Sequence, residues 1–403
     1  MNFCFISPNY PECYGNFCDR LKKNGVNVLG IGDAPYDELS DMLKEALTEY
    51  YKVDSLMDYD QVYKAVAYFA FNYGKIDWIE SQNEFWLEND ARLREDFNVN
   101  TGVKGSEIDK YVHKAMMHQM YADAMIPTAP QITITDLRKA KQFAKKVGYP
   151  VIVKPERGMG ASGTWKIRDD KELKAFFDEL PETTYVMEKF LSGRICAFNA
   201  IYDANGEIVF EQFMECDPIM DAVAEGNDLS YFTIPKVPLN VHLLGKKIID
   251  TLGAKSGLAH IEFIKLDQDY PGIGKKGDLS VLEHNMRAPG GFTLDMMNFT
   301  GSCDIYDLYA RMVKGEDLKK LVSKDTYYCA YAARKEHFCY KFSHEELMEK
   351  FGEAVMIDRF MPESDWEAMG QYMYIAKFKT SKQAENFMKT VLAKQGCAVR
   401  EIA

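Results

Sequence analysis

The chain has 403 residues, of which 47% are hydrophobic and 27% are charged, and its formal net charge at pH 7 is −12. This length is too great for one simple core and predicts roughly two to four domains of an ordinary globular protein. Acidic and basic residues are interspersed along the chain. The composition therefore disfavours nucleic acid as the main partner, because binding to a phosphate backbone requires a basic face.

Cysteine usage and hydropathy indicate the compartment. The nine cysteines are scattered, with no Cys-x-x-Cys pair, and the first residues lack the basic region of a signal peptide. No apolar run approaches the roughly 18–20 residues that cross a bilayer. We therefore expect a cytoplasmic protein with reduced thiols and no membrane contact.

The first part of the chain alternates strands with helices. Strands are expected at 2–7, 26–32 and 77–81, and helices at 13–25, 36–53 and 59–76. This alternation predicts an open parallel α/β sheet. No Gly-x-Gly-x-x-Gly follows the first strand, so the sequence does not support a dinucleotide site there.

A glycine-rich segment follows one long helix that is predicted over 109–125. The apolar strand Val151–Val153 continues into Lys154, and a second strand follows the loop that contains Gly158, Gly160, Ala161, Ser162 and Gly163. Such a loop lets backbone N–H groups approach an anion, although a flexible surface hairpin is the alternative. Lys154 lies within an apolar strand and needs a partner.

Polar residues alternate along a later strand, over 279–287. Glu283, Asn285 and Arg287 share one face, whereas Leu282, His284 and Met286 share the other. Glu262, on the strand predicted over 257–267, lies across from Glu283 and Asn285 if the two strands pair. Oxygen ligands on adjacent strands suit a divalent cation.

Two other interpretations of this strand are open. It is either an edge strand with solvated polar residues, or, less favoured, part of a zinc site at His260 and His284. Strand parity argues against the zinc site because His284 points away from Glu283.

Other elements are predicted along the chain. A β-hairpin is expected over 196–215, and the segment 216–238 is expected as a loop that forms a wall of an acceptor pocket. The last residues have the order βαββαβ, with the final strand at 397–402, which predicts an α+β module that is ferredoxin-like.

The motifs over residues 109–312 resemble the ATP-grasp superfamily, and within it the carboxylate–amine ligases. They include an early Lys before an Ile-Pro turn, Val-x-Lys-Pro with a Gly-rich loop, and a hinge that ends in Gly. Gly-x-x-His-x-Glu and Glu-x-Asn-x-Arg-x-x-Gly-Gly follow. In this chain the motifs occur at Lys114 before Ile126-Pro127, Val153-Lys154-Pro155, Glu188 to Gly193, Gly257 to Glu262, and Glu283 to Gly291.

The resemblance implies ATP and Mg²⁺ as cofactors, with Mn²⁺ as the alternative cation. It implies that Lys114 and Lys154 hold phosphates, that the loop Gly158 to Gly163 closes over them, and that Glu262, Glu283 and Asn285 hold the metal. It further implies that Glu188 and the backbone of Lys189, Phe190 and Leu191 contact the adenine edge. Arg287 would orient a substrate carboxylate and stabilise its acyl phosphate.

Two departures from the family pattern concern the nucleotide. Arg194 and Ile195 stand where an acidic residue often binds the ribose, so ribose binding is unassigned. The early Lys is usually preceded by Asp, but here His113 precedes Lys114. Lys110, after Asp109, is the rival, and the spacing to Pro127 favours Lys114.

The resemblance implies three regions and a reaction. The regions are an N-terminal pre-ATP-grasp domain at 1–108, an ATP-grasp domain at 109–316 (subdomains 109–187 and 188–316) and the module at 317–403. The expected enzyme is an ADP-forming ligase that joins a small carboxylate to an amine or a thiol. The alternatives are a non-catalytic ATP-binding regulatory protein and an ATP-grasp carboxylase acting on bicarbonate. A homodimer is left open.

Overall fold

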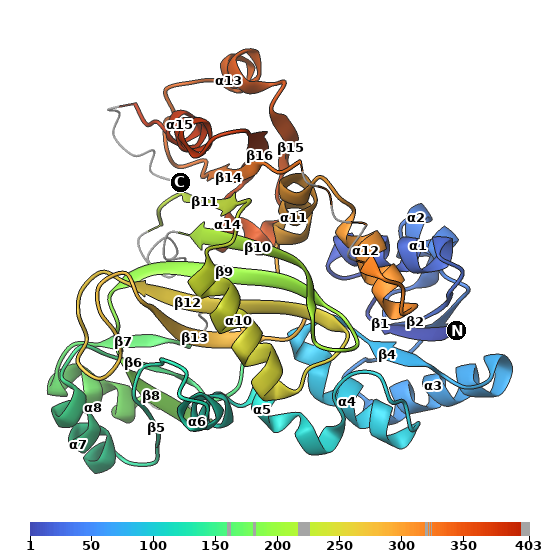
Figure 1. The fold of residues 1–403 in the computed structure, drawn as a ribbon, viewed down its shortest axis with the longest axis horizontal. Coiled ribbons are helices and arrows are strands. Elements are labelled where there is room, and N and C mark those ends of the chain that lie inside the picture. The colour runs from blue at the N-terminus through green and yellow to red at the C-terminus, as the bar shows by residue number, and fades with distance from the viewer. Residues whose placement is uncertain are drawn as a thin grey trace.

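The computed structural model describes residues 1–158, 163–179, 183–216, 226–318, 321, 323 and 325–395. Three β-sheets form its frame, and helices pack against them (Figure 1). The predicted α/β class is confirmed. None of the described helices is long and apolar enough to cross a membrane.

The N-terminal residues form a parallel sheet in the order β3-β2-β1-β4. Its strands are β1 (Asn2–Ile6), β2 (Asn27–Gly32), β3 (Glu49–Lys52) and β4 (Trp78–Glu80), and its helices are α1 (Gly15–Lys23), α2 (Asp41–Ala46), α3 (Tyr59–Tyr73) and α4 (Leu87–Asp96). The predicted open parallel sheet is confirmed. The helix predicted over 36–53 is wrong beyond Ala46, because the aromatic residues Tyr50 and Tyr51 belong to a strand that pairs with β2.

A small antiparallel sheet with the order β5-β8-β6-β7 carries the glycine-rich segment. Its strands are β5 (Gln131–Ile134), β6 (Val151–Pro155), β7 (Trp165–Ile167) and β8 (Tyr185–Lys189), with helices α7 (Leu137–Val147) and α8 (Asp170–Asp178). The helix predicted over 109–125 is two helices, α5 (Asp109–Val112) and α6 (Lys114–Asp123). The helical conformation is interrupted at His113, which has extended dihedral angles and contacts Glu156 through its imidazole.

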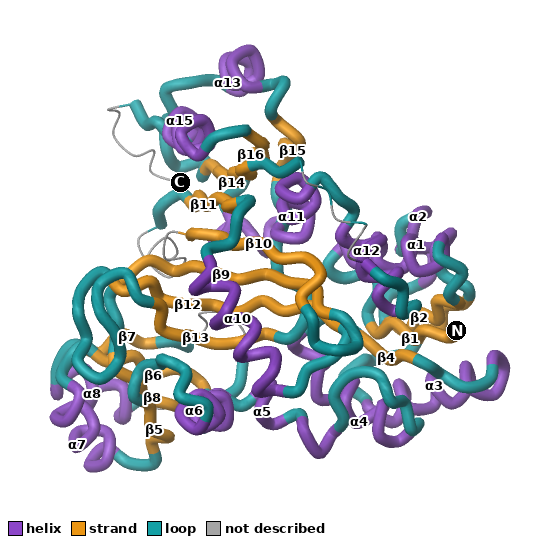
Figure 2. The backbone as a smooth tube through the Cα atoms, viewed as in Figure 1, coloured by secondary structure: helices purple, strands orange, loops and turns teal. Residues whose placement is uncertain are grey.

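The largest sheet has the order β13-β12-β9-β10-β11-β14-β16-β15 and runs continuously through the molecule (Figure 2). Its first strands are β9 (Gly193–Tyr202), β10 (Ile208–Cys216), β11 (Leu229–Ile234), β12 (Gly257–Leu266) and β13 (Leu279–Asn285), with helices α10 (Leu239–Leu252), α11 (Thr293–Gly301) and α12 (Ile305–Val313). The predicted hairpin is confirmed as β9 and β10. Strand β11, expected as loop, and helix α11 were missed.

The last residues extend this sheet. They form β14 (Tyr328–Arg334), α13 (His344–Phe351), β15 (Val355–Phe360), α14 (Trp366–Met369), β16 (Tyr372–Phe378) and α15 (Ser381–Val391). Since β16 is antiparallel to both its neighbours, β14 and β15 are parallel and form a split βαβ unit around it. The place beside β14 where a ferredoxin-like fold would put its fourth strand is filled by β11. The strand predicted at 397–402 lies outside the described residues, and the domain boundaries stay a prediction.

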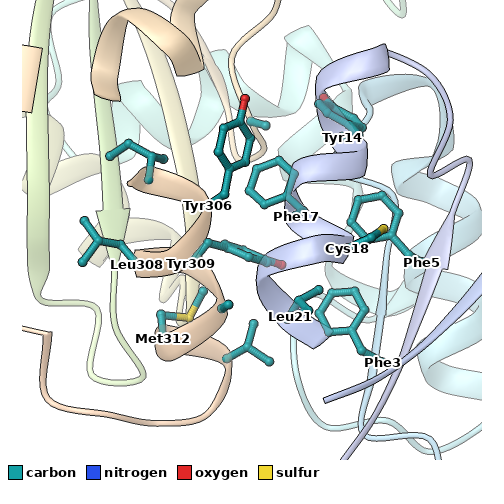
Figure 3. Packing of buried hydrophobic residues seen from close by; sticks show 14 of the residues in the cluster. Phe3, Phe5, Tyr14, Phe17, Cys18, Leu21, Tyr306, Leu308, Tyr309 and Met312 are labelled. Carbon is teal, nitrogen blue, oxygen red and sulfur yellow. The ribbon is translucent and has the colours of Figure 1, made fainter. Parts of the chain in front are cut away.

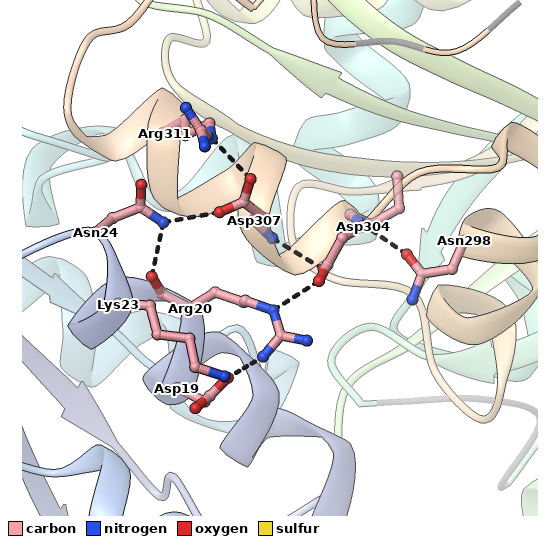
Figure 4. Close-up of polar contacts among 9 residues, drawn as sticks. Asp19, Arg20, Lys23, Asn24, Asn298, Asp304, Asp307 and Arg311 are labelled. Atoms are coloured by element: carbon pink, nitrogen blue, oxygen red, sulfur yellow. Dashed lines mark hydrogen bonds and ion pairs between the residues drawn. The ribbon is translucent and has the colours of Figure 1, made fainter.

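Helix α12 packs against α1 and joins the N-terminal sheet to the rest of the chain. The ring of Phe17 lies 4.8 Å from that of Tyr306 and 5.0 Å from that of Tyr309, centroid to centroid (Figure 3). Beside this core, Arg20 Nε donates to Asp304 Oδ2 at 2.6 Å (Figure 4). These contacts hold the N-terminal sheet in place next to β13, which carries the candidate site.

Candidate active site

Two carboxylates face each other across β12 and β13. The strands pair antiparallel, with Glu262 opposite Glu283 and His260 opposite Asn285. Asn285 Nδ2 donates to Glu283 Oε1 at 3.5 Å. The structure thus brings together the three residues predicted to hold a cation, while their role as ligands stays a prediction.

The pKa values of the two carboxyl groups are shifted in opposite directions. Burial and the nearby charge of Glu262 raise the pKa of Glu283. Burial also opposes ionisation of Glu262, yet His260, Arg287 and Lys154 together hold its pKa below the ordinary value. The repulsion at Glu283 is the kind of strain that a bound cation relieves, because it neutralises both carboxylates at once.

Two buried lysines lie on the side of the small sheet. Lys154 Nζ lies 3.0 Å from Glu188 Oε1, and both side chains are one-tenth exposed. Burial opposes the charge of Lys154, but Glu188 and Glu283 outweigh that effect and raise its pKa, so the ammonium persists. Lys114, at the start of α6, donates from Nζ to the carbonyl of Gly158 at 2.9 Å. Both ammonium groups also act on Glu283, so the two cations lie on the same side of the site.

The loop itself is described only at its ends. Gly158 and Gly163 have positive φ angles of 126° and 68°, which other residues rarely adopt. Gly160, Ala161 and Ser162, predicted to contact phosphates, lie outside the described residues. Glu156, which the sequence analysis missed, accepts hydrogen bonds from the amide of Ala115 and contacts His113 Nδ1 at 2.7 Å. It ties the start of the loop to the helix that carries Lys114.

The predicted hinge begins within the last residues of β8. Glu188 is engaged by Lys154 and also accepts from Gln131 Nε2 at 3.3 Å. The backbone N–H groups of Lys189 and Phe190 donate to Pro130 and Pro150 carbonyls. An adenine edge would therefore meet Leu191 or the carbonyls of this segment rather than those two amides.

An acidic residue near the hinge comes from a different strand. Glu215, on β10, pairs with Arg194 Nη1 at 3.1 Å and with Lys265 Nζ at 3.2 Å. The residues at 194 and 195 do not supply the expected acid, but the neighbouring strand places one beside them. No local sequence signal marks Glu215, because its proximity arises from the β9–β10 pairing.

Arg287 is held by a residue of the segment that follows β4. Its Nη2 donates to Glu84 Oε2 at 2.6 Å, and its Nη1 donates to the carbonyl of Ala288 at 2.8 Å. Its Nε is buried and has no hydrogen-bond partner within the described part of the chain. The fork predicted to hold a substrate carboxylate is thus partly engaged by a carboxylate of the protein.

The loop after β4 also fixes the residue that follows Arg287. Gln82, which is buried and has a φ of 55°, accepts the amide N–H of Ala288 at 3.0 Å and donates to the Tyr309 hydroxyl at 3.0 Å. Neither Gln82 nor Glu84 was predicted from the sequence as a site residue. Their place just after the carboxyl end of β4 is the sequence signal that could have indicated them, because ligands of α/β sheets bind at the carboxyl ends of the strands.

The alternative zinc site is not formed. His284 points to the opposite face of β13, where Nδ1 lies 2.6 Å from the Tyr121 hydroxyl and Nε2 lies 3.0 Å from the carbonyl of Lys110. Burial lowers the pKa of His284 to about 4. Among the described residues, no three or more His, Cys, Asp or Glu side chains form a metal-binding group. The predicted set has two carboxylates and an amide, which is the ligand chemistry of a hard cation.

Comparisons with known proteins concern the family and the fold. The profile of the family described as carbamoyl-phosphate synthase L chain, ATP binding domain, matches residues 109–226. Over these residues the match supports the predicted resemblance to the ATP-grasp superfamily. It is 24% identical to the carbamoyl phosphate synthase large chain of Agathobacter rectalis over 232 residues, which is 54% of this chain and 20% of that one. The large chain of Pyrococcus furiosus is 23% identical over 49% of this chain and 18% of its own length. The chain thus spans about a fifth of the length of these relatives.

Solved structures share the fold over nearly the whole chain. An L-amino acid ligase from Bacillus licheniformis has a TM-score of 0.72, with 14% identity and coverage of 96% of both chains. A phosphoribosylglycinamide synthetase from Anaerococcus prevotii has a TM-score of 0.67, with 14% identity and coverage of 97% of both chains. At such identities the likeness establishes the fold alone.

Proposed function

We propose that this chain is an ATP-dependent ligase that activates a small carboxylate as an acyl phosphate and joins it to an amine or a thiol, releasing ADP and phosphate. The observation that carries the proposal is the antiparallel pair Glu262 and Glu283, with the Lys154 ammonium beside it and Arg287 just beyond the strand. This set combines cation ligands, phosphate-binding charge and a carboxylate fork.

The residues present fit Mg²⁺. The raised pKa of Glu283 reflects burial and the charge of its neighbour, Glu262, and a divalent cation held by the two carboxylates would offset both effects. Glu262, Glu283 and Asn285 would hold it. Bound there, Mg²⁺ supplies charge that neutralises the transferring phosphoryl group.

The two lysines would hold the nucleotide phosphates. Lys154 and Lys114 are both buried and charged side chains on the same side of the site. Buried ammonium groups act in a low dielectric, so their attraction to phosphate oxygens is stronger than at a surface. ATP bound there would present its γ-phosphate toward the end of β13.

Arg287 would orient the acid. A guanidinium binds a carboxylate through two parallel hydrogen bonds, which fixes the attacking oxygen. The carboxylate oxygen attacks the γ-phosphorus, the bond to the ADP oxygen breaks, and an acyl phosphate results. The amine or thiol then attacks the acyl carbon, and phosphate leaves. No protein nucleophile is required.

The test is a matrix of substrates. The protein is incubated with ATP, Mg²⁺ and one of a panel of acids (amino acids, other small carboxylates and bicarbonate), with and without an amine, and ADP and phosphate are measured. We expect release that depends on both acid and amine, and its loss in Glu283→Ala. Glu349→Ala, an exposed carboxylate on α13, is the matched control. ADP release that requires bicarbonate alone would favour a carboxylase, and no ATP binding by calorimetry would refute the ligase.

A further inference from the structure

A cavity of about 300 Å³ lies between the N-terminal sheet and the start of β12. Residues from the end of β4, from α4 and α5, from the end of β9 and from the segment 253–258 line it, together with Met286. Small-molecule sites in proteins occupy roughly 300–1,000 Å³, so the volume suits a small ligand. Neither Arg287 nor the carboxylates Glu262 and Glu283 line this cavity, which separates it from the candidate active site.

A buried ion pair forms one wall of the cavity. Arg94 Nη2 lies 3.0 Å from Glu80 Oε1, and the two residues are 3% and 9% exposed. The guanidinium also donates to two backbone carbonyls, those of Ile79 and Val103. The protein therefore fixes Arg94. Among the described residues, the second oxygen of Glu80 accepts only a long hydrogen bond, at 3.4 Å from Gln82 Nε2.

The buried charges beside this wall do not balance. Asp90, on α4, is fully buried, and burial together with the charge of Asp90 raises the pKa of Glu80 to about 7, although Arg94 opposes the shift. Burial raises the pKa of Asp90 as well. Two carboxyl groups thus share one guanidinium. A buried charge without a partner is costly, so a cation in the cavity would stabilise the ionised form of Glu80.

A tyrosine hydroxyl in the cavity has no partner. Tyr202 is 4% exposed and lines the cavity, and its hydroxyl forms no hydrogen bond with any residue that the structure describes. Burial raises the pKa of Tyr202, and Tyr111 and Glu80 add to the effect, so these groups lie close together. A buried hydroxyl without a partner costs free energy, which a ligand that donates to it would recover.

These groups favour a primary ammonium as the ligand. A carboxylate and a hydroxyl oxygen both accept hydrogen bonds, and an ammonium group offers three donors and a positive charge. Leu258 and Met286 also line the cavity and offer apolar surface for a carbon chain. A bare divalent cation is less suited, because it takes about six oxygen ligands. Among the described residues, no three or more His, Cys, Asp or Glu side chains form such a group.

We infer that this cavity binds a small organic molecule with a primary ammonium group, which donates to the carboxylate of Glu80 and to the hydroxyl of Tyr202. The inference does not depend on the proposed function. The occupant would lie close to the support of Arg287, because Gln82 donates to Glu80 and accepts the amide N–H of Ala288 at 3.0 Å. The cavity is therefore placed where an effector of the candidate active site would bind.

The direct test is calorimetry with three amines as probes, ethanolamine, putrescine and L-lysine. The controls are KCl and 1,4-butanediol, in which hydroxyls replace the ammonium groups of putrescine. We expect at least one amine to bind with a dissociation constant of about 1 mM or lower, and neither control to bind at about 10 mM. Binding of no amine, or equal binding of KCl, would overturn the inference. Loss of amine binding in Glu283→Ala would also overturn it, because the amine would then lie at the candidate active site.

Two tyrosine variants locate the bound amine. Tyr202→Phe removes a single hydroxyl, and we expect it to weaken amine binding about tenfold or more, since a hydrogen bond to a charged group is lost. Tyr185→Phe is the matched control, because Tyr185 is also 4% exposed but belongs to β8 of the small sheet. It should leave the dissociation constant unchanged. A Tyr202→Phe variant that binds the amine as tightly as the parent would overturn the inference.

A charge variant tests the other contact. Glu80→Gln keeps the size of the side chain and removes its charge, and we expect it to abolish amine binding at about 10 mM. Its melting temperature shows whether it folds, and Tyr202→Phe decides the matter if it does not. A folded Glu80→Gln variant with the affinity of the parent would refute the contact between the ammonium and Glu80. Failure of the ligase assay with amine binding retained would refute the proposed function alone.

Discussion

Replacement of Lys154 by methionine would leave a buried carboxylate without its partner. Glu188 lies 3.0 Å from the lost ammonium, and both side chains are one-tenth exposed. Loss of one partner of a buried pair costs about 3–5 kcal/mol, mainly because the other charge stays desolvated. Lys154 also neutralises Glu283 and Glu262. We therefore expect Lys154→Met to lie at the upper end of that range.

The reverse replacement should be milder. In Glu188→Met the Lys154 ammonium keeps Glu283 and Glu262 as partners. We therefore expect the free energy of unfolding to fall by about 1–3 kcal/mol, which is the contribution of one hydrogen bond to a charged group. The double variant should recover most of the stability lost in Lys154→Met, because an apolar pair replaces the ion pair. Urea unfolding of all four proteins measures this cycle, and calorimetry measures ATP binding. A double variant no more stable than Lys154→Met would refute the reasoning.

Three further substitutions test other parts of the structure. Glu84→Gln should lower KM for the acid roughly tenfold in steady-state kinetics, because a charged competitor for Arg287 is lost; a higher KM would mean that Glu84 serves the substrate instead. Burial raises the pKa of Asp295 to about 6, so the native protein loses stability as the pH rises from about 4 to 6. The free energy of unfolding of Asp295→Asn relative to the parent should increase by about 2–3 kcal/mol over that pH interval, as measured by urea unfolding. A difference in stability that does not change with pH would contradict the raised pKa of Asp295. Gly245→Ala should lower the melting temperature despite the better helix propensity of alanine, because its Cβ would lie 2.5 Å from the Phe198 ring; an unchanged melting temperature would mean that the ring moves aside.

Local patterns predicted the features that depend on neighbouring residues. Strand parity placed Glu283 and Asn285 on one face and His284 on the other, and the structure has this arrangement. The parallel sheet followed from the alternation of apolar strands with amphipathic helices. Such periodicities arise from the geometry of a single element, and one sequence is enough to show them.

Features that depend on tertiary contacts could not be predicted in this way. The break at His113 is accompanied by contact with Glu156, which directly follows β6. Residues Glu49–Lys52 form a strand because β2 offers an edge, although the preceding residues favour a helix. Strand β11 fills the place beside β14 for the same reason. In each case a distant partner overrides the local preference.

The contact between Arg287 and Glu84 changes where specificity is expected. The sequence predicted that the segment 216–238 forms a wall of the acceptor pocket, but its residues 217–225 lie outside the described structure and Leu229–Ile234 form β11. Glu84 and Gln82 instead approach the end of β13 from the segment that follows β4. An acid bound by Arg287 would therefore lie against the loop after β4. Exchange of residues in that loop should alter which acid is accepted, whereas changes at β11 should alter stability.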